Sequence, residues 1–259
     1  MTTRLIKTEQ DIMGIRHSCH ILAEIFKEVV AMVEPGITTA DLEDRACKLI
    51  AQAGGRPAFK DYRTSPKAKA FPTALCTSLN NTIVHGPALP AKLLRAGDII
   101  GIDVGMDLNG YYSDMAATIA VGRISNEALH LLQTTKQALQ LGIDQIKPGN
   151  TLNDIGTAIQ TYVEKQGLSV VRDLVGHGVG LAVHEDPQIP HYAIAGSGLP
   201  DMTLRPGMVL AIEPMINMGG WKIKIAKDGF GFETADNSLS AHFEHTILVT
   251  INGWEILTK

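Results

Sequence analysis

The stretch Arg95-Ala96-Gly97-Asp98-Ile99-Ile100-Gly101-Ile102-Asp103 decides how this chain is built, because a second version of it follows. That version reads Arg205-Pro206-Gly207-Met208-Val209-Leu210-Ala211-Ile212-Glu213, 110 residues further on. Each stretch is a turn followed by a short aliphatic run, which predicts a buried strand, and each run ends in an acid. The match predicts two similar halves, with Asp103 and Glu213 in equivalent positions.

A second match lies before the first one in each half. Pro, Gly, Thr and Asp recur at the same places in Glu34–Leu42 and Lys147–Ile155. Thr-x-x-Asp after a Pro-Gly turn is a helix-start signature, and apolar residues at helical spacing follow it. Helices are also predicted over Asp11–Val33 and about Ser125–Leu141. We therefore predict an α+β fold, with a curved antiparallel sheet covered by helices on one face, in a single domain over 1–259.

The composition is that of an ordinary soluble globular protein, with 45% hydrophobic and 19% charged residues among 259. The net charge of −4 gives no basic surface for nucleic acid or an anionic membrane. The sequence contains no apolar run of membrane-spanning length and no signal-peptide core, so we expect a cytoplasmic protein. The cysteines, at 19, 47 and 76, form no C-x-x-C pair and are interpreted as reduced.

Two acids flank a predicted turn. Asp103 and Asp114 lie on either side of Asp107–Gly110, whose composition is typical of a hairpin turn. Adjacent strands of a hairpin would bring both carboxylates onto one face. Asp107 itself is interpreted as a turn cap or as the partner of a surface base.

Further acids and histidines stand in apolar runs punctuated by glycine: His85, His177, His184, Glu213 and Glu244. An ionised side chain in such a run needs a compensating partner. The glycines around His177 allow close approach of the backbone, but no Lys and Ser/Thr pair completes a phosphate-binding loop. A carboxylate-rich set suits Mn²⁺, Fe²⁺, Co²⁺ or Mg²⁺ better than a thiolate-rich zinc site. Four carboxylates and one histidine fit two ions about 3.5–4 Å apart.

Short motifs spread along the whole chain combine these residues: Asn80-x-Thr82-x-x-His85-Gly86, Asp103-x-Gly105, Tyr112-Ser113-Asp114, Gly176-His177-Gly178-Val179-Gly180, His184-Glu185-x-Pro187, Ile212-Glu213-Pro214 and Phe243-Glu244-His245-Thr246. Together they resemble the motifs of the type I methionine aminopeptidases, which are metallopeptidases of the pita-bread (creatinase/aminopeptidase) fold in family M24. The resemblance implies that fold, with pseudo-twofold halves, and a hydrolase with a dinuclear metal centre.

The resemblance also implies the roles of individual residues. The metal ligands would be Asp103, Asp114, His177, Glu213 and Glu244. Asp114 and Glu244 would bridge two divalent ions, for which cobalt, manganese, iron and zinc are all candidates. A water with a lowered pKa would be the nucleophile, and Glu213 would act as general base. His184 would contact the scissile peptide unit, and His85 would stabilise the tetrahedral intermediate or the departing nitrogen.

Two further sets of residues match positions of the family. Tyr62, Phe71, Cys76 and Phe230 would line the pocket for the substrate side chain, with ordinary core packing as the other interpretation. Asn80, Thr82 and Ser240 match the positions that form a monovalent-cation site, for Na⁺ or K⁺, in some members.

The chain departs from the family pattern near that pocket. Arg63–Ala70 is an insertion with three basic residues, which either narrows, opens or covers the pocket or is a solvated surface loop. Val183 and Phe230 stand where several members carry a larger aromatic residue. An enlarged pocket would shift the side-chain preference without touching the metal ions.

The resemblance predicts removal of initiator methionine from new proteins whose second residue is small and uncharged. The partner would be the N-terminal peptide of a nascent protein, with ribosome contact open and a monomer expected. Two alternatives share the fold: an Xaa-Pro aminopeptidase or prolidase-like peptidase, and a non-catalytic binding protein. An iron oxygenase would need two histidines and one carboxylate on one ion, which matches this acid-rich set less well.

Overall fold

The computed structural model describes residues 4–195, 198 and 200–259. Within them the helices are α1 (Glu9–Val30), α2 (Thr39–Gln52), α3 (Asn126–Ile143) and α4 (Leu152–Lys165). The strands are β1 (Arg56–Pro57), β2 (Leu75–Leu79), β3 (Thr82–Val84), β4 (Ile99–Leu108), β5 (Tyr111–Ala120), β6 (Ser169–Val170), β7 (Gly176–Gly178), β8 (Glu185–Ile189), β9 (Val209–Ile212), β10 (Met215–Asn217), β11 (Ile223–Ile225), β12 (Phe232–Thr234), β13 (Ser240–His242), β14 (Glu244–Thr250) and β15 (Gly253–Ile256).

The helices begin where the Thr-x-x-Asp signatures predict. At α2 the Thr38 N–H donates to Asp41 Oδ2 at 2.8 Å, and at α4 the Thr151 N–H donates to Asp154 Oδ2 at 2.8 Å. These contacts satisfy backbone donors that have no partner within the first turn of a helix. All four predicted helices are confirmed, with ends that differ by a few residues from the predicted ones. In the described parts of the chain no helix is both long and apolar enough to span a bilayer.

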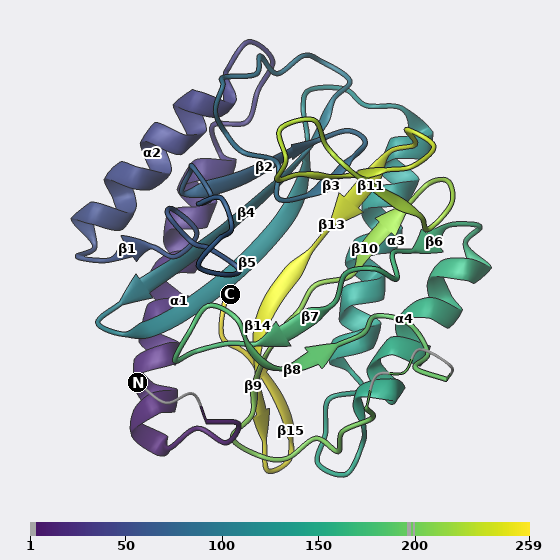
Figure 1. Cartoon of the computed structure of the whole chain (residues 1–259). Coiled ribbons are helices and arrows are strands. Elements are labelled where there is room, and N and C mark those ends of the chain that lie inside the picture. The colour runs from purple at the N-terminus through teal and green to yellow at the C-terminus, as the bar shows by residue number, and fades with distance from the viewer. Residues whose placement is uncertain (1–3, 196–197, 199) are drawn as a thin grey trace.

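The central sheet is antiparallel and strongly curved. Its strand order is β1-β4-β5-β14-β9-β7-β8, with β2 added beside β4 and β15 beside β14. Figure 1 shows α1 and α2 beside the β4–β5 side of the sheet and α3 and α4 beside the other side. Two small sheets, β13-β10-β6 and β11-β12-β3, complete the fold. The predicted strands before Asp103 and Glu213 are β4 and β9, so the α+β architecture is confirmed.

The long hairpin of β4 and β5 sets the positions of two acids. Its turn residues Asn109 and Gly110 have φ of 57° and 83°, the left-handed pair of a two-residue hairpin turn. The register pairs Gly105 with Asp114 and Asp103 with Ala116, so the two carboxylates are diagonal neighbours on one face. Side chains alternate along a strand, and those on the opposite face of β4 pack against α1 and α2: Ile100, Ile102, Val104 and Met106.

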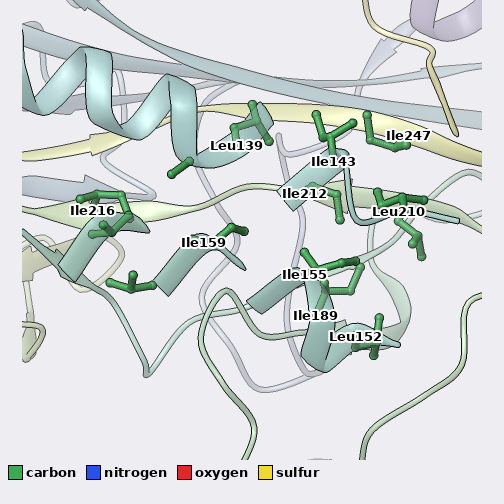
Figure 2. Packing of buried hydrophobic residues seen from close by; sticks show 14 of the residues in the cluster. Leu139, Ile143, Leu152, Ile155, Ile159, Ile189, Leu210, Ile212, Ile216 and Ile247 are labelled. Atoms are coloured by element: carbon green, nitrogen blue, oxygen red, sulfur yellow. The ribbon is translucent and has the colours of Figure 1, made fainter. Parts of the chain in front are cut away.

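The other side of the sheet is supported by α3 and α4. Figure 2 shows their apolar side chains packed against the strands, among them Ile143 and Ile159 against Leu210 and Ile212. Burying each such side chain contributes about 1.5–3 kcal/mol, so the cluster fixes β9 and the residue that follows it, Glu213. Thus α1 and α2 pack against β4 much as α3 and α4 pack against β9. The division into two pseudo-symmetric halves stays a prediction.

Candidate metal centre

A cavity of about 860 Å³ opens on the face of the sheet where the predicted site residues meet. Its walls include every predicted metal ligand and both predicted catalytic histidines: His85, Asp103, Asp114, His177, His184, Glu213 and Glu244. They come from β4, β5, β7 and β14 and from the ends of β3, β8 and β9. The structure therefore brings together residues that are up to 159 positions apart in the sequence.

The donor atoms converge within contact range. Those of Asp114, His177 and Glu244 all lie within 4.8 Å of one another. His177 Nε2 is 3.3 Å from Glu213 Oε1 and 3.9 Å from Asp114 Oδ2. The predicted bridging acids, Asp114 and Glu244, come from the paired strands β5 and β14. Donor atoms at these separations can share one divalent ion, whose carboxylate and imidazole ligands lie about 2.0–2.2 Å from it.

The glycines around His177 are required by close packing. A Cβ at Gly178 would lie 2.2 Å from the Asp186 carbonyl oxygen, and one at Gly176 would lie 2.4 Å from that of Ala211. Only glycine lets β7 fit between β8 and β9. The His177 Nδ1–H donates to the Gly178 carbonyl oxygen at 2.9 Å, which leaves the lone pair on Nε2 facing the acids.

Several oxygens of the acids are buried without a donor. Asp103 Oδ1, Asp114 Oδ1 and Glu244 Oε1 have no hydrogen-bond partner among residues 4–195, 198 and 200–259. Burial raises the pKa of Asp103 to about 7. Burial and, after it, the neighbouring carboxylates raise the pKa of Asp114 and of Glu244 well above the usual range. Buried oxygens of this kind need a cation, and one imidazole among carboxylates suits a divalent one.

The histidines at the cavity are held neutral. Burial lowers the pKa of His177 to about 3 and the pKa of His85 and of His184 to about 4. The His184 ring meets the rings of His177 and Tyr62 edge-on, with centroid distances of 4.5 and 5.0 Å. A neutral imidazole offers one N–H donor and one lone pair, so these residues can bind a metal ion or donate to a substrate oxygen.

Sequence reasoning missed two histidines that lie behind Glu213. The Glu213 backbone N–H donates to His191 Nε2 at 3.1 Å. His242 Nε2 lies 3.4 Å from Glu213 Oε2, opposite the oxygen that faces His177. The available signal for His242 was its place between the apolar residues Ala241 and Phe243, two residues before Glu244. His191 carries no comparable signal, since it lies beyond β8 in a loop.

The comparisons with known proteins agree with this geometry. The model of metallopeptidase family M24 matches residues 13–251. The chain belongs to this family. Methionine aminopeptidase 1 of Bacillus subtilis is 43% identical over 256 residues, which cover 98% of this chain and 99% of that protein. As a member of family M24 the chain is a metal-dependent hydrolase.

Solved structures of similar proteins share the fold. The crystal structure of methionine aminopeptidase from Thermotoga maritima superposes with a TM-score of 0.92 at 41% identity, with each chain covered completely. The prolidase of Pyrococcus horikoshii superposes with a TM-score of 0.75 at 24% identity, and the match covers 99% of this chain but 64% of the prolidase. The predicted pita-bread fold is confirmed. The prolidase likeness supports the fold alone.

The predicted pocket residues gather on one wall of the M24 site. Tyr62, Phe71, Cys76 and Phe230 all line the cavity, and the sequence analysis missed Phe59 beside them. The Phe71 and Phe230 rings meet edge-on with centroids 5.5 Å apart. Val183 is buried in the same apolar cluster. These side chains form a mostly apolar wall next to the acids.

The insertion at Arg63–Ala70 borders the cavity mouth. Thr64, Ala68 and Lys69 line the cavity, and Lys69 Nζ lies 4.3 Å from the centroid of the Phe230 ring. This cation–π contact joins the insertion to the loop on the other side of the mouth. The segment therefore borders the pocket, and its effect on the width of the pocket stays a prediction.

The predicted monovalent-cation residues lie close to one another at one end of the sheet. The Ser240 N–H donates to the Asn80 carbonyl oxygen at 2.9 Å. The Asn80 side chain is engaged with Asp98 and Ile99, and the Ser240 hydroxyl donates to the Ile216 carbonyl oxygen. Thr82 starts β3, two residues after Asn80. Cation binding by this set stays a prediction.

The raised carboxylate pKa values predict how pH acts on the metal-free protein. Burial raises the pKa of Asp114, Glu213 and Glu244 well above the unfolded value of about 4, so the folded state keeps protons that the unfolded state loses. Unfolded histidines are already neutral above about pH 7 and no longer oppose this effect. We expect the free energy of unfolding to fall between pH 7 and 8.

Urea denaturation in the presence of a chelator measures this pH effect. A divalent ion replaces the protons, so the slope between pH 7 and 8 should become much smaller when metal is added. A metal-free protein with the same stability at both pH values would contradict the prediction.

Proposed function

We propose that this protein is a methionyl aminopeptidase, which removes the initiator methionine from new proteins whose second residue is small and uncharged. The observation that carries the proposal is the set of buried, donorless carboxylate oxygens at the base of a cavity with an apolar wall. Full-length relatives named methionine aminopeptidase support it, among them one 44% identical from Clostridium perfringens.

The metal centre in this proposal holds two divalent ions. Asp103, Asp114, His177, Glu213 and Glu244 would hold them, with Asp114 and Glu244 shared between the ions. Cobalt, manganese, iron and zinc all suit this donor set. Once bound, the ions supply Lewis acidity and lower the pKa of a water molecule toward neutrality. The carboxylates would hold the ions beside the apolar wall of the cavity.

Glu213 is placed to act as general base. One of its oxygens faces His177 at 3.3 Å and the other faces His242 at 3.4 Å, so the carboxylate has a fixed orientation. Burial raises the pKa of Glu213 in the metal-free protein, so bound cations would be needed to keep this carboxylate ionised and able to accept a proton. It would take a proton from the attacking water and pass it to the departing amine.

His85 and His184 are placed to donate to the substrate. Both line the cavity and both are neutral, so each has an N–H to offer. His184 would contact the scissile peptide unit. His85 would stabilise the tetrahedral intermediate or the departing nitrogen. Fixed donors aimed at developing charge are typically worth about 10²–10³ in turnover rate.

The apolar wall would hold the methionine side chain. Tyr62, Phe71 and Phe230 present aromatic edges, against which a thioether sulfur packs favourably. Cys76 adds a polarisable thiol at the buried end, where burial raises its pKa and keeps it protonated. The same proposal places the protein in the cytoplasm as a monomer that acts on nascent chains, with ribosome contact and a monovalent cation as further features.

Reconstitution of the metal-free chain tests this function. The protein would be loaded separately with Mn²⁺, Fe²⁺, Co²⁺ and Zn²⁺ and assayed on Met-Ala-Ser and on Xaa-Pro peptides. We expect metal-dependent release of methionine from Met-Ala-Ser. Turnover of Xaa-Pro peptides alone would favour the prolidase-like alternative, and binding without any turnover would favour the non-catalytic one.

Replacement of His184 with Gln separates binding of metal from use of substrate. We expect the rate of methionine release to fall about 10²–10³-fold, while the affinity for metal ions stays unchanged, because His184 is not among the proposed ligands. Calorimetry measures the affinity and peptide assays measure the rate. His130→Gln, on an exposed part of α3, is the matched control and should alter neither quantity. A large loss of metal affinity in the His184 variant would contradict the assigned role.

A further inference from the structure

His242 is a buried histidine that the proposed mechanism does not use as a ligand. It ends β13, two residues before Glu244, and only 3% of its surface is exposed. Its Nε2 atom has no hydrogen-bond partner in the part of the chain that the structure describes. A buried ring nitrogen without a hydrogen bond is costly, so this atom calls for a bound partner.

The surroundings of His242 favour a metal ion as its partner. The donor atoms of His242, Glu213 and Glu244 all lie within 4.8 Å of one another. The Nε2 atom is 3.4 Å from Glu213 Oε2. Two ligands that are each about 2.1 Å from one ion lie about 3.0–3.5 Å apart, so this separation fits a shared ion. His177 is related in the same way to the other Glu213 oxygen, at 3.3 Å.

Hydrogen bonds and strand pairing hold the backbone of His242 on both sides. Its N–H donates to Thr118 Oγ1 at 2.9 Å, and the same hydroxyl donates to the His242 carbonyl oxygen at 2.9 Å. On its other side β13 pairs with β10, where His242 is opposite Met215. A fixed backbone limits the positions that the imidazole can take, so ligation orders less of the chain.

We propose that His242 is a sixth protein ligand of the metal centre and binds, through Nε2, the ion that Glu213 and Glu244 also contact. This inference rests on the metal centre of the proposed function. It adds a second imidazole to a set that otherwise has one. A nitrogen donor favours borderline ions such as iron, cobalt and zinc over magnesium, so His242 would bias the centre toward them.

Direct observation of metal–nitrogen bonds tests the proposal. The full chain would be prepared with ¹⁵N-labelled histidine, loaded with ¹¹³Cd²⁺ and studied by NMR. We expect ¹¹³Cd–¹⁵N couplings to two imidazoles in the natural sequence and to one, that of His177, in His242→Gln. Calorimetry with Co²⁺ should show that one binding step weakens by at least about 10–100-fold in this variant.

His245→Gln is the matched control, since His245 bonds Thr258 through Nδ1 and lies outside both groups of candidate ligands. It should keep both couplings and the affinity for Co²⁺. A single coupled imidazole in the natural sequence would overturn the proposal and leave His242 as a hydrogen-bond donor to Glu213. The spectrum of the natural sequence is decisive without any variant. If His242→Gln does not fold, His242→Asn offers a second substitution.

The outcomes distinguish this inference from the proposed function. Two coupled imidazoles in a protein that releases no methionine would overturn the function and support the ligand. Methionine release by a protein with a single coupled imidazole would support the function and overturn the assignment of His242 as a ligand.

Discussion

Asp114→Asn is expected to lower methionine release by at least about 10³-fold and, at the same time, to make the metal-free protein more stable. Asp114 is 2% exposed, its Oδ1 atom has no donor among the described residues, and neighbouring acids add to the effect of burial in raising its pKa. A neutral amide of the same shape removes that repulsion. We expect a gain of about 1–3 kcal/mol in the free energy of unfolding without metal.

Asp107→Asn is the matched control on the same hairpin. Asp107 is also buried, at 6% exposed, but it has its partners: Arg56 Nη2 at 2.6 Å and the Gly110 N–H at 2.8 Å. The control should be less stable than the natural protein and should keep its activity. Urea denaturation with a chelator and peptide assays with metal measure both variants. An Asp114 variant that is destabilised without metal would contradict the account of the acids as mutually repelling.

The second large effect is expected at the amino-terminal segment. Lys7 Nζ lies 2.6 Å from Glu185 Oε2, and the two side chains are 1% and 2% exposed. The other oxygen of Glu185 accepts from the Ala182 N–H, in the loop that carries His184. Lys7→Met leaves a buried carboxylate without its cation, which typically costs about 3–5 kcal/mol. We expect a loss of this size in the free energy of unfolding.

The double variant Lys7→Met with Glu185→Gln should recover most of that loss, because neither charge then remains buried. Lys27→Met is the matched control, since Lys27 pairs with Glu24 on the exposed side of α1. Exposed pairs contribute about 0–1 kcal/mol, so this variant should be close to the natural protein. Urea denaturation of the metal-loaded forms measures all three. Equal losses in the free energy of unfolding for Lys7→Met and Lys27→Met would contradict the claim that burial makes the Lys7–Glu185 pair important.

Much of this molecule could be predicted from its sequence because local signals and buried charges agree. The Thr-x-x-Asp boxes set the helix starts, and Asn109-Gly110 sets the register of the hairpin. That register alone brings Asp103 and Asp114 to one face. Acids in apolar runs could be recognised as candidate ligands because burial of an unpaired charge is expensive. The interpretation of Asp107 as a turn cap paired with a base is confirmed.

Other features depend on contacts between distant segments and carry little local signal. His242 and Glu213 are 29 positions apart and meet only because β13 pairs with β10 just beyond β9. Phe59 joins the pocket wall through the loop that precedes the insertion. The position of Lys69 over Phe230 depends on two surface loops whose path the sequence does not specify. Periodicity predicts the face that a residue takes on its own strand, but not which strand lies opposite.

The predicted metal ligands are synthesised at different times, because they lie on strands that are far apart in the sequence. Asp103 and Asp114 emerge early, whereas Glu244 lies on β14, the strand between β5 and β9. Until β14 is inserted between β5 and β9, the strands of the two sequence repeats are not joined in one sheet. The proposed metal centre then lacks the side chain of Glu244. In a growing chain we therefore expect the proposed metal centre to form only after this strand has been made and inserted.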